Sequence, residues 1–424
     1  MMIQLPKEFI HTTKELMGEE RFERYLQSFE EETPVSIRLN PKKSSGLTAI
    51  EGELVPWCRD AFYLKNRPGF TFDPLFHAGC YYVQEAASMF LDEVLRQLSS
   101  LYPSPVTLHA LDLCAAPGGK STLLRSALSE ECALYSNEPM RNRASILLEN
   151  VTKWGYENHF GTNLFPKDYR KSKMKFDVIL CDVPCSGEGM FRKDSNAASE
   201  WSTQNVEKCW RLQREIVADA WECLNPGGIL IYSTCTFNIK ETEENVRWIL
   251  ETYDAEPIAI PTEPEWNITG SLLEGFDIPV YRFIPGITRG EGLFMCALRK
   301  GGGRNVISSP PESGGVRGGL NSTSDHLRNL RQMIPSFRPP LTPPDSGGEP
   351  PRVDLSYQDA LKYLRGEALV LPPDTPKGIV TVTYKGYPLG PVKNIGNRAN
   401  NLYPKSWRIK TTHLPSEPVE ILPQ

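Results

Sequence analysis

Short apolar runs alternate with longer amphipathic segments through the middle of the chain. Such runs precede Asp112, Asp182 and Cys235, and each is bounded by turn residues, which is typical of buried parallel strands. Two more strands are predicted at 132–136 and 158–164. The segments between the runs carry apolar residues at helical spacing. Repeated strand–helix alternation predicts an α/β fold with a mainly parallel sheet and right-handed crossovers.

The ends of this alternating region have their own patterns. A strand at 36–40 and a segment 81–90 that leads into a helix to about Leu98 are expected before it. A terminal antiparallel hairpin is expected from 281–286 and 293–298. The helices expected within the region span 141–154, 203–224 and 241–253.

Composition divides the chain further. Residues 1 to about 70 have the spacing of a small helical segment, and roughly a third of residues 301–351 are Gly or Pro, which is typical of a linker. A short helix is predicted inside that linker at 325–331. A compact α+β module with a helix at 357–364 and a hairpin at 378–390 follows. The predicted domains are 1–74, 75–300, a linker at 301–354, and 355–424.

Charge and cysteine content exclude several classes of protein. The 424 residues carry a net charge of −5, but residues 356–424 hold nine Lys and Arg against five Asp and Glu, which favours a polyanion partner for that module. No apolar run reaches the ~18 residues of a membrane span, and the first residues lack a signal-peptide pattern. The ten cysteines form no Cys-x-x-Cys pair. A cytoplasmic protein without membrane or metal is therefore expected.

A glycine-containing loop follows the strand that ends at Asp112. Adjacent glycines let the backbone approach a ligand, and the next helix offers free N–H groups at its start. A P-loop would need glycine where Cys114 stands, and no Gly-x-Gly-x-x-Gly occurs here. The loop is therefore expected to bind a ligand other than a triphosphate or a dinucleotide. The residues of this candidate site are Cys114, Ala115, Ala116, Pro117, Gly118, Gly119 and Lys120.

An acidic residue stands at the end of the second strand. Glu138 lies 26 residues after Asp112, close to the interval at which a carboxylate accepts hydrogen bonds from a ribose diol. A sheet that binds a nucleoside without a pyrophosphate fits S-adenosyl-L-methionine, which carries a reactive methyl group.

Two cysteines follow two further strands. Cys185 lies in Asp182-Val183-Pro184-Cys185-Ser186-Gly187, and Cys235 lies in Ser233-Thr234-Cys235-Thr236. Ligands of open α/β sheets bind outside the carboxyl ends of the strands, so both thiols are expected in one crevice. A thiolate that adds to carbon 6 of a pyrimidine activates carbon 5 as a methyl acceptor. A base must then remove the carbon-5 proton, and an acid such as Asp182 can bind the ring nitrogen and amino group.

These motifs resemble the signatures of the Sun-type (NSUN) RNA cytosine-C5 methyltransferases. The resemblance rests on the segments 113–121, 182–187 and 233–236, and Arg38-Leu39-Asn40 and Tyr82-Val83-Gln84-Glu85 are similar to the N-terminal motifs of that family. Segments 363–367 and 407–409 resemble the PUA-like end of its bacterial 16S ribosomal-RNA branch. The resemblance implies a Rossmann-like methyltransferase domain, a small N-terminal domain and a C-terminal PUA-like domain.

The resemblance also implies roles for single residues. Cys235 would be the nucleophile, Cys185 would assist product release, and Asp182 would lie beside cofactor and base. The loop from Cys114 to Lys120 would hold the methionine and sugar part of the cofactor. Where many members have Asp near the adenine, this chain has Asn163, with Asp168 as the alternative.

The residues alone do not rank the two cysteines, because DNA cytosine-C5 methyltransferases use the cysteine of a Pro-Cys motif, which here is Cys185. The family resemblance favours Cys235. Lys120 and Lys193 are cations that could lower the pKa of a thiol.

The predicted activity is methylation of carbon 5 of a cytosine in 16S ribosomal RNA by a monomer. Transfer RNA as the substrate, or a non-catalytic RNA-binding assembly factor, are the alternatives.

Overall fold

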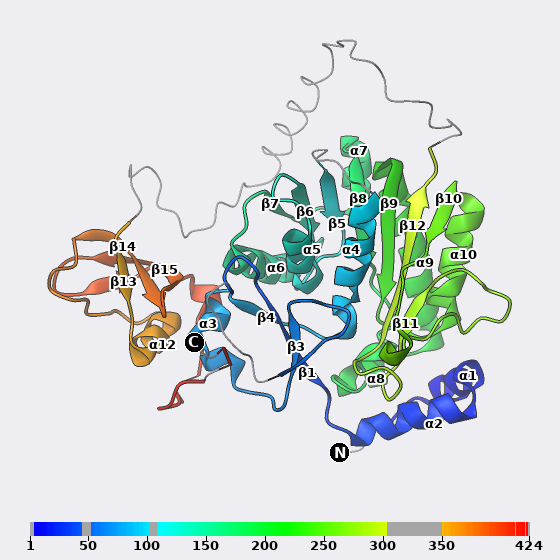
Figure 1. Ribbon diagram of the computed structural model, residues 1–424, viewed down its shortest axis with the longest axis horizontal. Helices are drawn as coiled ribbons and strands as arrows, with labels where there is room; N and C mark the ends of the chain where they lie inside the picture. The colour runs from blue at the N-terminus through cyan, green and yellow to red at the C-terminus, as the bar shows by residue number, and fades with distance from the viewer. Residues whose placement is uncertain are drawn as a thin grey trace, which may run out of the picture.

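The computed structural model describes residues 4–44, 52–101, 108–302, 350–411, 413–419 and 421–422. An eight-stranded sheet with helices on both faces occupies the centre, and a four-stranded sheet lies in each of the N-terminal and C-terminal parts (Figure 1). The helix predicted at 325–331 lies outside the described residues.

The central sheet has the order β10-β12-β9-β8-β5-β6-β7, with β11 paired to β12. Neighbours from β9 to β7 run parallel, whereas β12 is antiparallel to β9, β10 and β11. The predicted mainly parallel sheet with an antiparallel hairpin at its end is thus confirmed. The strands are β5 (His109–Asp112), β6 (Ala133–Asn137), β7 (His159–Thr162), β8 (Phe176–Asp182), β9 (Leu224–Thr234), β10 (Ala255–Ile258), β11 (Tyr281–Phe283) and β12 (Leu293–Lys300).

Helices cover both faces of this sheet because each carries an apolar stripe. On one face Leu95 and Leu124 join strand residues such as Leu180 in one core. On the other, Val217 and Val246 pack in a second core. The helices are α4 (Phe90–Leu101), α5 (Gly119–Ala127), α6 (Arg141–Trp154), α7 (Pro166–Ser172), α8 (Ser195–Glu200), α9 (Thr203–Cys223) and α10 (Glu243–Thr252).

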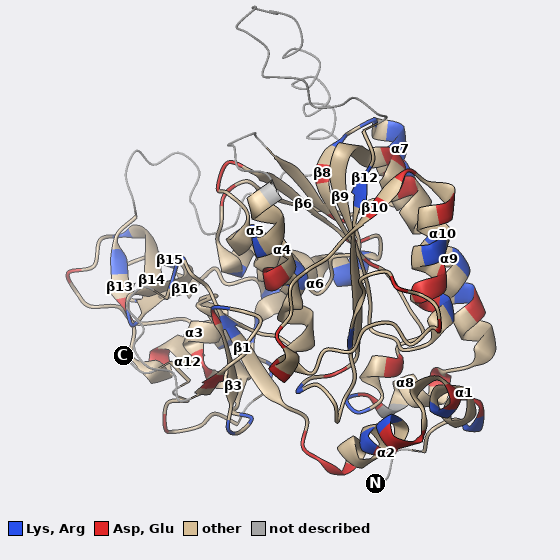
Figure 2. Ribbon diagram, turned by 45° about the vertical axis from the view of Figure 1, so that its right-hand side comes forward, with Lys and Arg blue, Asp and Glu red and all other residues tan. Residues whose placement is uncertain are grey.

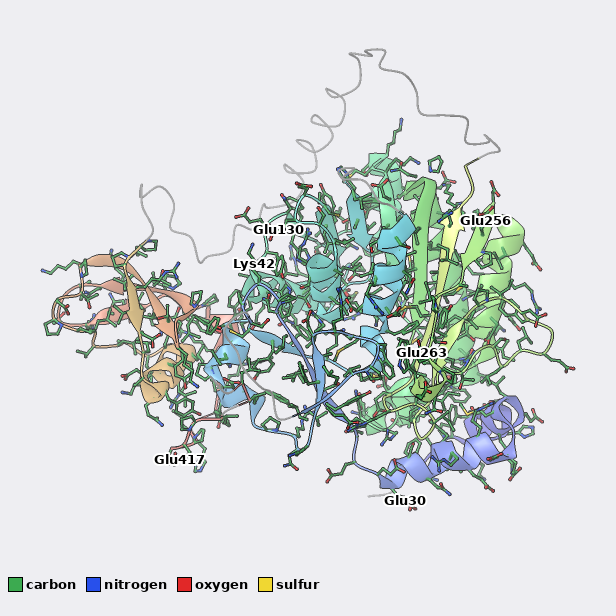
Figure 3. The ribbon with its side chains drawn as sticks, in the orientation of Figure 1. Glu30, Lys42, Glu130, Glu256, Glu263 and Glu417 are labelled. Carbon is green, nitrogen blue, oxygen red and sulfur yellow. The ribbon has the colours of Figure 1, made fainter. Side chains whose placement is uncertain are left out.

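The N-terminal part contains more strand than the sequence indicated. Its sheet has the order β2-β3-β1-β4. Lys42, which follows β1, lies 3.4 Å from Glu130 of the central part, and Figure 3 labels both residues. Phe9 of the first helix stacks edge-on against Phe191, with 4.9 Å between the ring centroids. The elements are α1 (Lys7–Met17), α2 (Glu19–Gln27), β1 (Val35–Leu39), β2 (Gly52–Leu54), β3 (Ala61–Leu64), α3 (Pro74–His77) and β4 (Tyr81–Val83).

The C-terminal module packs beside α3 rather than standing apart (Figure 1). Buried residues of α12, including Leu361, share one hydrophobic core with Ile37 and Tyr81 of the N-terminal sheet. The Tyr357 hydroxyl donates to the carbonyl of Phe72 at 3.1 Å. The elements of the module are β13 (Arg352–Asp354), α12 (Tyr357–Arg365), β14 (Gly378–Tyr384), β15 (Tyr387–Asn394) and β16 (Ala399–Asn401).

Charged residues of both signs are interspersed along α1, α2, α9 and α10 (Figure 2). Within the described segments, no helix is long and apolar enough to cross a membrane.

Candidate active site

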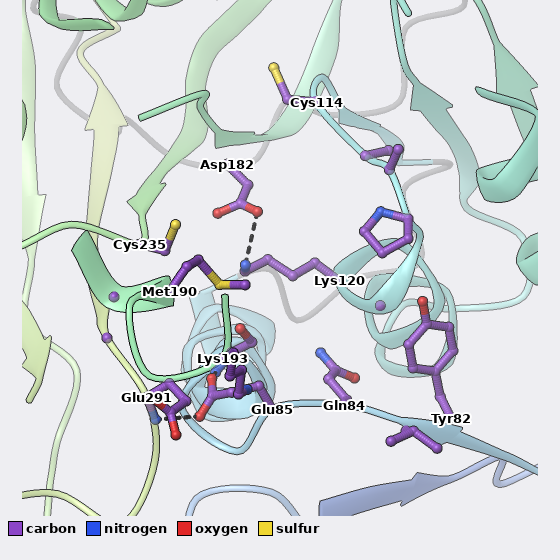
Figure 4. A pocket seen from close by; sticks show the side chains of 18 of the residues that line it. Tyr82, Gln84, Glu85, Cys114, Lys120, Asp182, Met190, Lys193, Cys235 and Glu291 are labelled. Atoms are coloured by element: carbon purple, nitrogen blue, oxygen red, sulfur yellow. Dashed lines mark hydrogen bonds and ion pairs between the residues drawn. The ribbon is translucent and has the colours of Figure 1, made fainter. Parts of the chain in front are cut away.

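A cavity of about 280 Å³ opens where β5, β8 and β9 end. Cys114 lies at one end of it, Asp182, Lys120 and Cys235 lie in the middle, and Gln84 lies toward the opposite end (Figure 4). The carboxyl ends of parallel strands and the last strand of the N-terminal sheet therefore build the cavity together.

The two predicted thiols meet beside this cavity. The sulfurs of Cys185 and Cys235 are 3.2 Å apart, because their loops leave the neighbouring parallel strands β8 and β9, where Asp182 pairs with Ser233. The hydrogen bond with Cys235, together with burial, raises the pKa of Cys185 well above its usual value. Cys185 therefore retains its proton and can donate its S–H to the sulfur of Cys235. The two thiols lie together, and of the pair Cys235 lines the cavity whereas Cys185 lies beside it.

A buried carboxylate holds the two cysteine loops together. Glu188 accepts hydrogen bonds from the backbone N–H groups of Phe237 and Asn238, at 2.7 and 2.9 Å. It also accepts from the Thr236 hydroxyl at 2.6 Å and the Trp201 indole at 3.0 Å. A carboxylate with this many donors fixes the backbone just after Cys235.

A second buried carboxylate supports the other side of the pair. Glu241 accepts from the backbone N–H of Ser186 at 3.0 Å and from the Gln213 amide at 2.7 Å. Gln213 also donates to the carbonyl of Pro184, at 2.9 Å. Burial raises the pKa of Glu241 to about 7. The segment around Cys185 is thus held from α9 and from the segment that follows Cys235.

Asp182 and Lys120 form an ion pair at the centre of the cavity. Lys120 Nζ lies 2.9 Å from Asp182 Oδ2, and the dashed line in Figure 4 marks this contact. Burial opposes the charged form of Lys120, but the neighbouring carboxylate prevails and the pKa of Lys120 is raised. The amine is therefore a cation beside Cys235. Lys193 also lines the cavity.

The glycine loop lines the cavity from Cys114 to Lys120, except for Gly118. Gly118 has φ +115°, a conformation that disfavours side chains, and a Cβ there would lie 3.2 Å from Leu147 Cδ1. Asp112 below the loop accepts from the Ser121 hydroxyl at 2.6 Å. Burial raises the pKa of Asp112 to about 7.

The other predicted cofactor residues lie outside the set that lines the cavity. Glu138 is buried at the end of β6, and its carboxylate accepts from the N–H of Met140 at 2.9 Å. Asn163 donates to the carbonyls of Glu138 and Pro139, at 2.6 and 2.9 Å. Asp168 accepts from the N–H of Phe165 at the start of α7, at 3.0 Å. Asn163 thus orients the turn that carries Glu138, and the predicted adenine contact of Asn163 or Asp168 stays a prediction.

Sequence reasoning gave no role to several residues that shape the cavity. Gln84, Glu85 and Glu291 line it, and Glu85 accepts from the N–H of Glu291 at 2.8 Å. These contacts join segments more than 200 positions apart in the chain, so no local pattern indicates them. Glu188 directly follows the motif at 182–187 and could have been found as an acid between two glycines.

The described residues contain no group of three or more His, Cys, Asp and Glu side chains arranged to hold a metal ion. The expected absence of a metal stays a prediction.

Three family models match consecutive parts of the chain. Residues 100–299 match a model described as 16S rRNA methyltransferase RsmB/F. Residues 5–86 match the N-terminal domain of 16S rRNA methyltransferase RsmF, and residues 350–409 match the RsmF PUA domain.

Known proteins agree with this assignment. Ribosomal RNA small subunit methyltransferase F of Pectobacterium atrosepticum is 33% identical over 72% of this chain, and the alignment covers 65% of that protein, slightly under two thirds. The protein of the same name from Escherichia coli is 28% identical, with 95% of this chain and 96% of that protein covered. A crystal structure of a methyltransferase homologue from Pyrococcus horikoshii superposes with a TM-score of 0.55 at 26% identity, over 70% of this chain and all of that one. The predicted resemblance and Rossmann-like fold are confirmed, and the chain belongs to the RsmB/F family of methyltransferases.

Proposed function

We propose that the protein methylates carbon 5 of a cytosine in small-subunit ribosomal RNA, with S-adenosyl-L-methionine as the methyl donor. The observation that carries the proposal is the pair of thiols 3.2 Å apart beside the Lys120–Asp182 ion pair. One thiol can add to the pyrimidine ring, and the second can assist the later release of the product.

The residues present fit the cofactor. Gly119 begins α5, so free N–H groups face the loop from Cys114 to Pro117. Glu138 follows β6, the strand beside β5 in the sheet, which is where a carboxylate meets a ribose diol. When bound, the cofactor supplies an electrophilic methyl group. The glycine loop would hold its methionine and sugar part, and Glu138 would hold the ribose.

Cys235 is the proposed nucleophile. The cation of Lys120 lines the same cavity, and the S–H of Cys185 lies within hydrogen-bond reach of its sulfur, at 3.2 Å. The thiolate bonds to carbon 6 of the flipped cytosine, and the electron pair moves to carbon 5, which takes the methyl group. Asp182 binds the ring nitrogen and amino group and stabilises the charge that builds there.

Cys185 is the proposed group for product release. Loss of the carbon-5 proton to a base restores the double bond between carbons 5 and 6, and the bond from carbon 6 to the Cys235 sulfur breaks. The departing sulfur needs a proton or a hydrogen bond. The S–H of Cys185 lies within reach of it at 3.2 Å.

Two findings support ribosomal RNA as the substrate: the names of the relatives and the match of the C-terminal module. Relatives over 95% of this chain are named small-subunit ribosomal RNA methyltransferases. The segment 350–409 matches a PUA domain and carries the basic excess of the sequence. We propose that it contacts RNA phosphates, which makes binding salt-sensitive.

The test measures transfer of labelled methyl groups to 16S ribosomal RNA and to transfer RNA. Cys235→Ala should abolish transfer, whereas Cys185→Ala should trap a covalent RNA–protein adduct that resists denaturation. Cys209→Ala is the matched control, because Cys209 is half-buried in α9 and does not line the cavity. Full activity of Cys235→Ala would contradict the assigned nucleophile, and transfer to transfer RNA alone would contradict the RNA class.

A further inference from the structure

The side chain of Gln84 has an unused hydrogen-bond donor inside the cavity. Gln84 follows β4 and is only 6% exposed, yet its Nε2 has no hydrogen-bond partner among the described residues. An amide nitrogen that is buried without a partner is costly. The cavity that it lines offers a place for a ligand atom that would accept from it.

Arg38 fixes which way this amide points. Its Nε lies 2.9 Å from Oε1 of Gln84, and a guanidinium can only donate. The amide oxygen must therefore face Arg38, and the NH₂ must face away from it. Arg38 itself is held by the Thr122 hydroxyl at 2.6 Å, the carbonyl of Gly119 at 3.2 Å, and the ring of Trp154, 4.6 Å from its centroid.

The NH₂ group lies against the start of α5. A Cβ at Gly119 would be 3.5 Å from Nε2 of Gln84, so a side chain there would lie against the amide. In Figure 4 the amide nitrogen points toward the middle of the cavity, and Cys114 lies at the far end. The donor thus faces the space bounded by Lys120 and Cys235, away from the end of β5.

Three charged groups around this space are engaged by protein partners. Lys120 is paired with Asp182. Glu85 accepts from the N–H groups of Ala87 and Ser88, both at 2.9 Å. Glu291 is paired with Arg192 at 3.1 Å. The amide of Gln84 is therefore a buried neutral donor without a partner among the described residues, and a ligand with a carbonyl oxygen matches it.

We propose that the amide NH₂ of Gln84 donates a hydrogen bond to the O2 carbonyl oxygen of the target pyrimidine. The inference rests on the proposed function and adds a residue that recognises the base. Asp182 binds the edge with the ring nitrogen and amino group, and Gln84 binds the adjacent carbonyl, so the ring is held from two sides while carbon 6 faces Cys235. The alternative acceptor is the carboxylate of the bound cofactor.

Gln84→Met tests the inference because it keeps the length of the side chain and removes the donor. We expect the KM for 16S ribosomal RNA to rise about tenfold, the size expected for one lost hydrogen bond. The Kd for S-adenosylhomocysteine should stay unchanged. Gln97→Met is the matched control, because the Gln97 amide donates to Glu93 in α4, away from the cavity.

Gln84→Glu is the second variant. Its carboxylate still accepts from Arg38, so it should unfold at the same temperature as the wild type, but it presents no N–H to the base. The same rise in KM is expected. An unchanged KM in both variants would overturn the inference, as would a weaker Kd for S-adenosylhomocysteine with an unchanged KM for RNA. A wild type that binds S-adenosylhomocysteine but transfers no methyl group to any RNA would overturn the proposed function and this inference with it.

Discussion

At the scale of single residues, burial without enough hydrogen-bond donors raises the pKa of Asp112. Asp112 is fully buried beneath the glycine loop, and the Ser121 hydroxyl donates to its Oδ2 at 2.6 Å. Its Oδ1 has no hydrogen-bond partner within the described part of the chain. Glu188 is also buried but receives several donors. Desolvation therefore dominates at Asp112 and raises its pKa to about 7.

The raised pKa of Asp112 predicts a pH-dependent stability. The folded protein keeps this proton up to about pH 7, whereas the unfolded chain releases it near pH 4. The contribution of Asp112 is therefore full below about pH 4 and is lost as the pH rises to about 7. Asp112→Asn cannot ionise, so its unfolding free energy relative to the wild type should increase by on the order of 2 kcal/mol between pH 5 and pH 8.

Thermal unfolding of the two proteins across this pH range checks the prediction. Val370→Ala serves as the control, because Val370 is 83% exposed and neither side chain at that position ionises. If the difference in unfolding free energy between Asp112→Asn and the wild type did not change with pH, the raised pKa of Asp112 would be contradicted.

At the scale of elements, the two cysteine loops and the loop before β12 pack closely against each other. Glycines at the contact allow this, because they have no side chain. The N–H of Gly189 donates to the carbonyl of Cys235 at 2.8 Å. A Cβ at Gly292 would lie 2.5 Å from Cα of Gly189 and 2.7 Å from Cζ of Phe237. The loop before β12 thus sets the distance between the two cysteine loops.

Gly292→Ala should push these loops apart. We expect methyl transfer to fall by roughly ten- to a hundredfold, because shifts of about 1 Å in reacting groups have effects of that size. Gly270→Ala is the matched control, since a Cβ there meets nothing within 4 Å. Wild-type rates in Gly292→Ala, measured with the same RNA and cofactor, would show that the loops can separate without cost.

The length of each strand explains how much of the fold could be predicted from the sequence. The strands before Asp182 and Cys235 and the glycine loop were predicted because local apolar runs and turn residues specify them. The sheet of β1 to β4 was largely missed because β2 and β4 have only three residues each. Strands this short carry little periodicity, and pairing between distant segments stabilises them. The contact between Gln84 and Arg38 depends on that pairing and was missed for the same reason.

At the scale of the whole molecule, the C-terminal module and the cavity are linked through β4. Tyr81 at the start of β4 belongs to the core that Leu361 of α12 shares, and Gln84 follows the end of the same strand. The Tyr81 hydroxyl donates to Asp73 at 2.7 Å, beside the start of α3. The predicted boundary at 355 therefore separates segments that share a core, and removing the module would expose apolar surface of the N-terminal sheet.

Leu361→Ala tests this coupling without deleting any segment. Leu361 is fully buried, so the substitution should lower the unfolding free energy by about 2–5 kcal/mol. Because the core is shared, amide hydrogen exchange should quicken in β1 and β4 as well as in α12. The control is Val370→Ala, since Val370 is 83% exposed in the same module. Faster exchange confined to 352–409 would mean that the module unfolds alone, whereas faster exchange in β4 would make the position of Gln84 depend on the RNA-binding module.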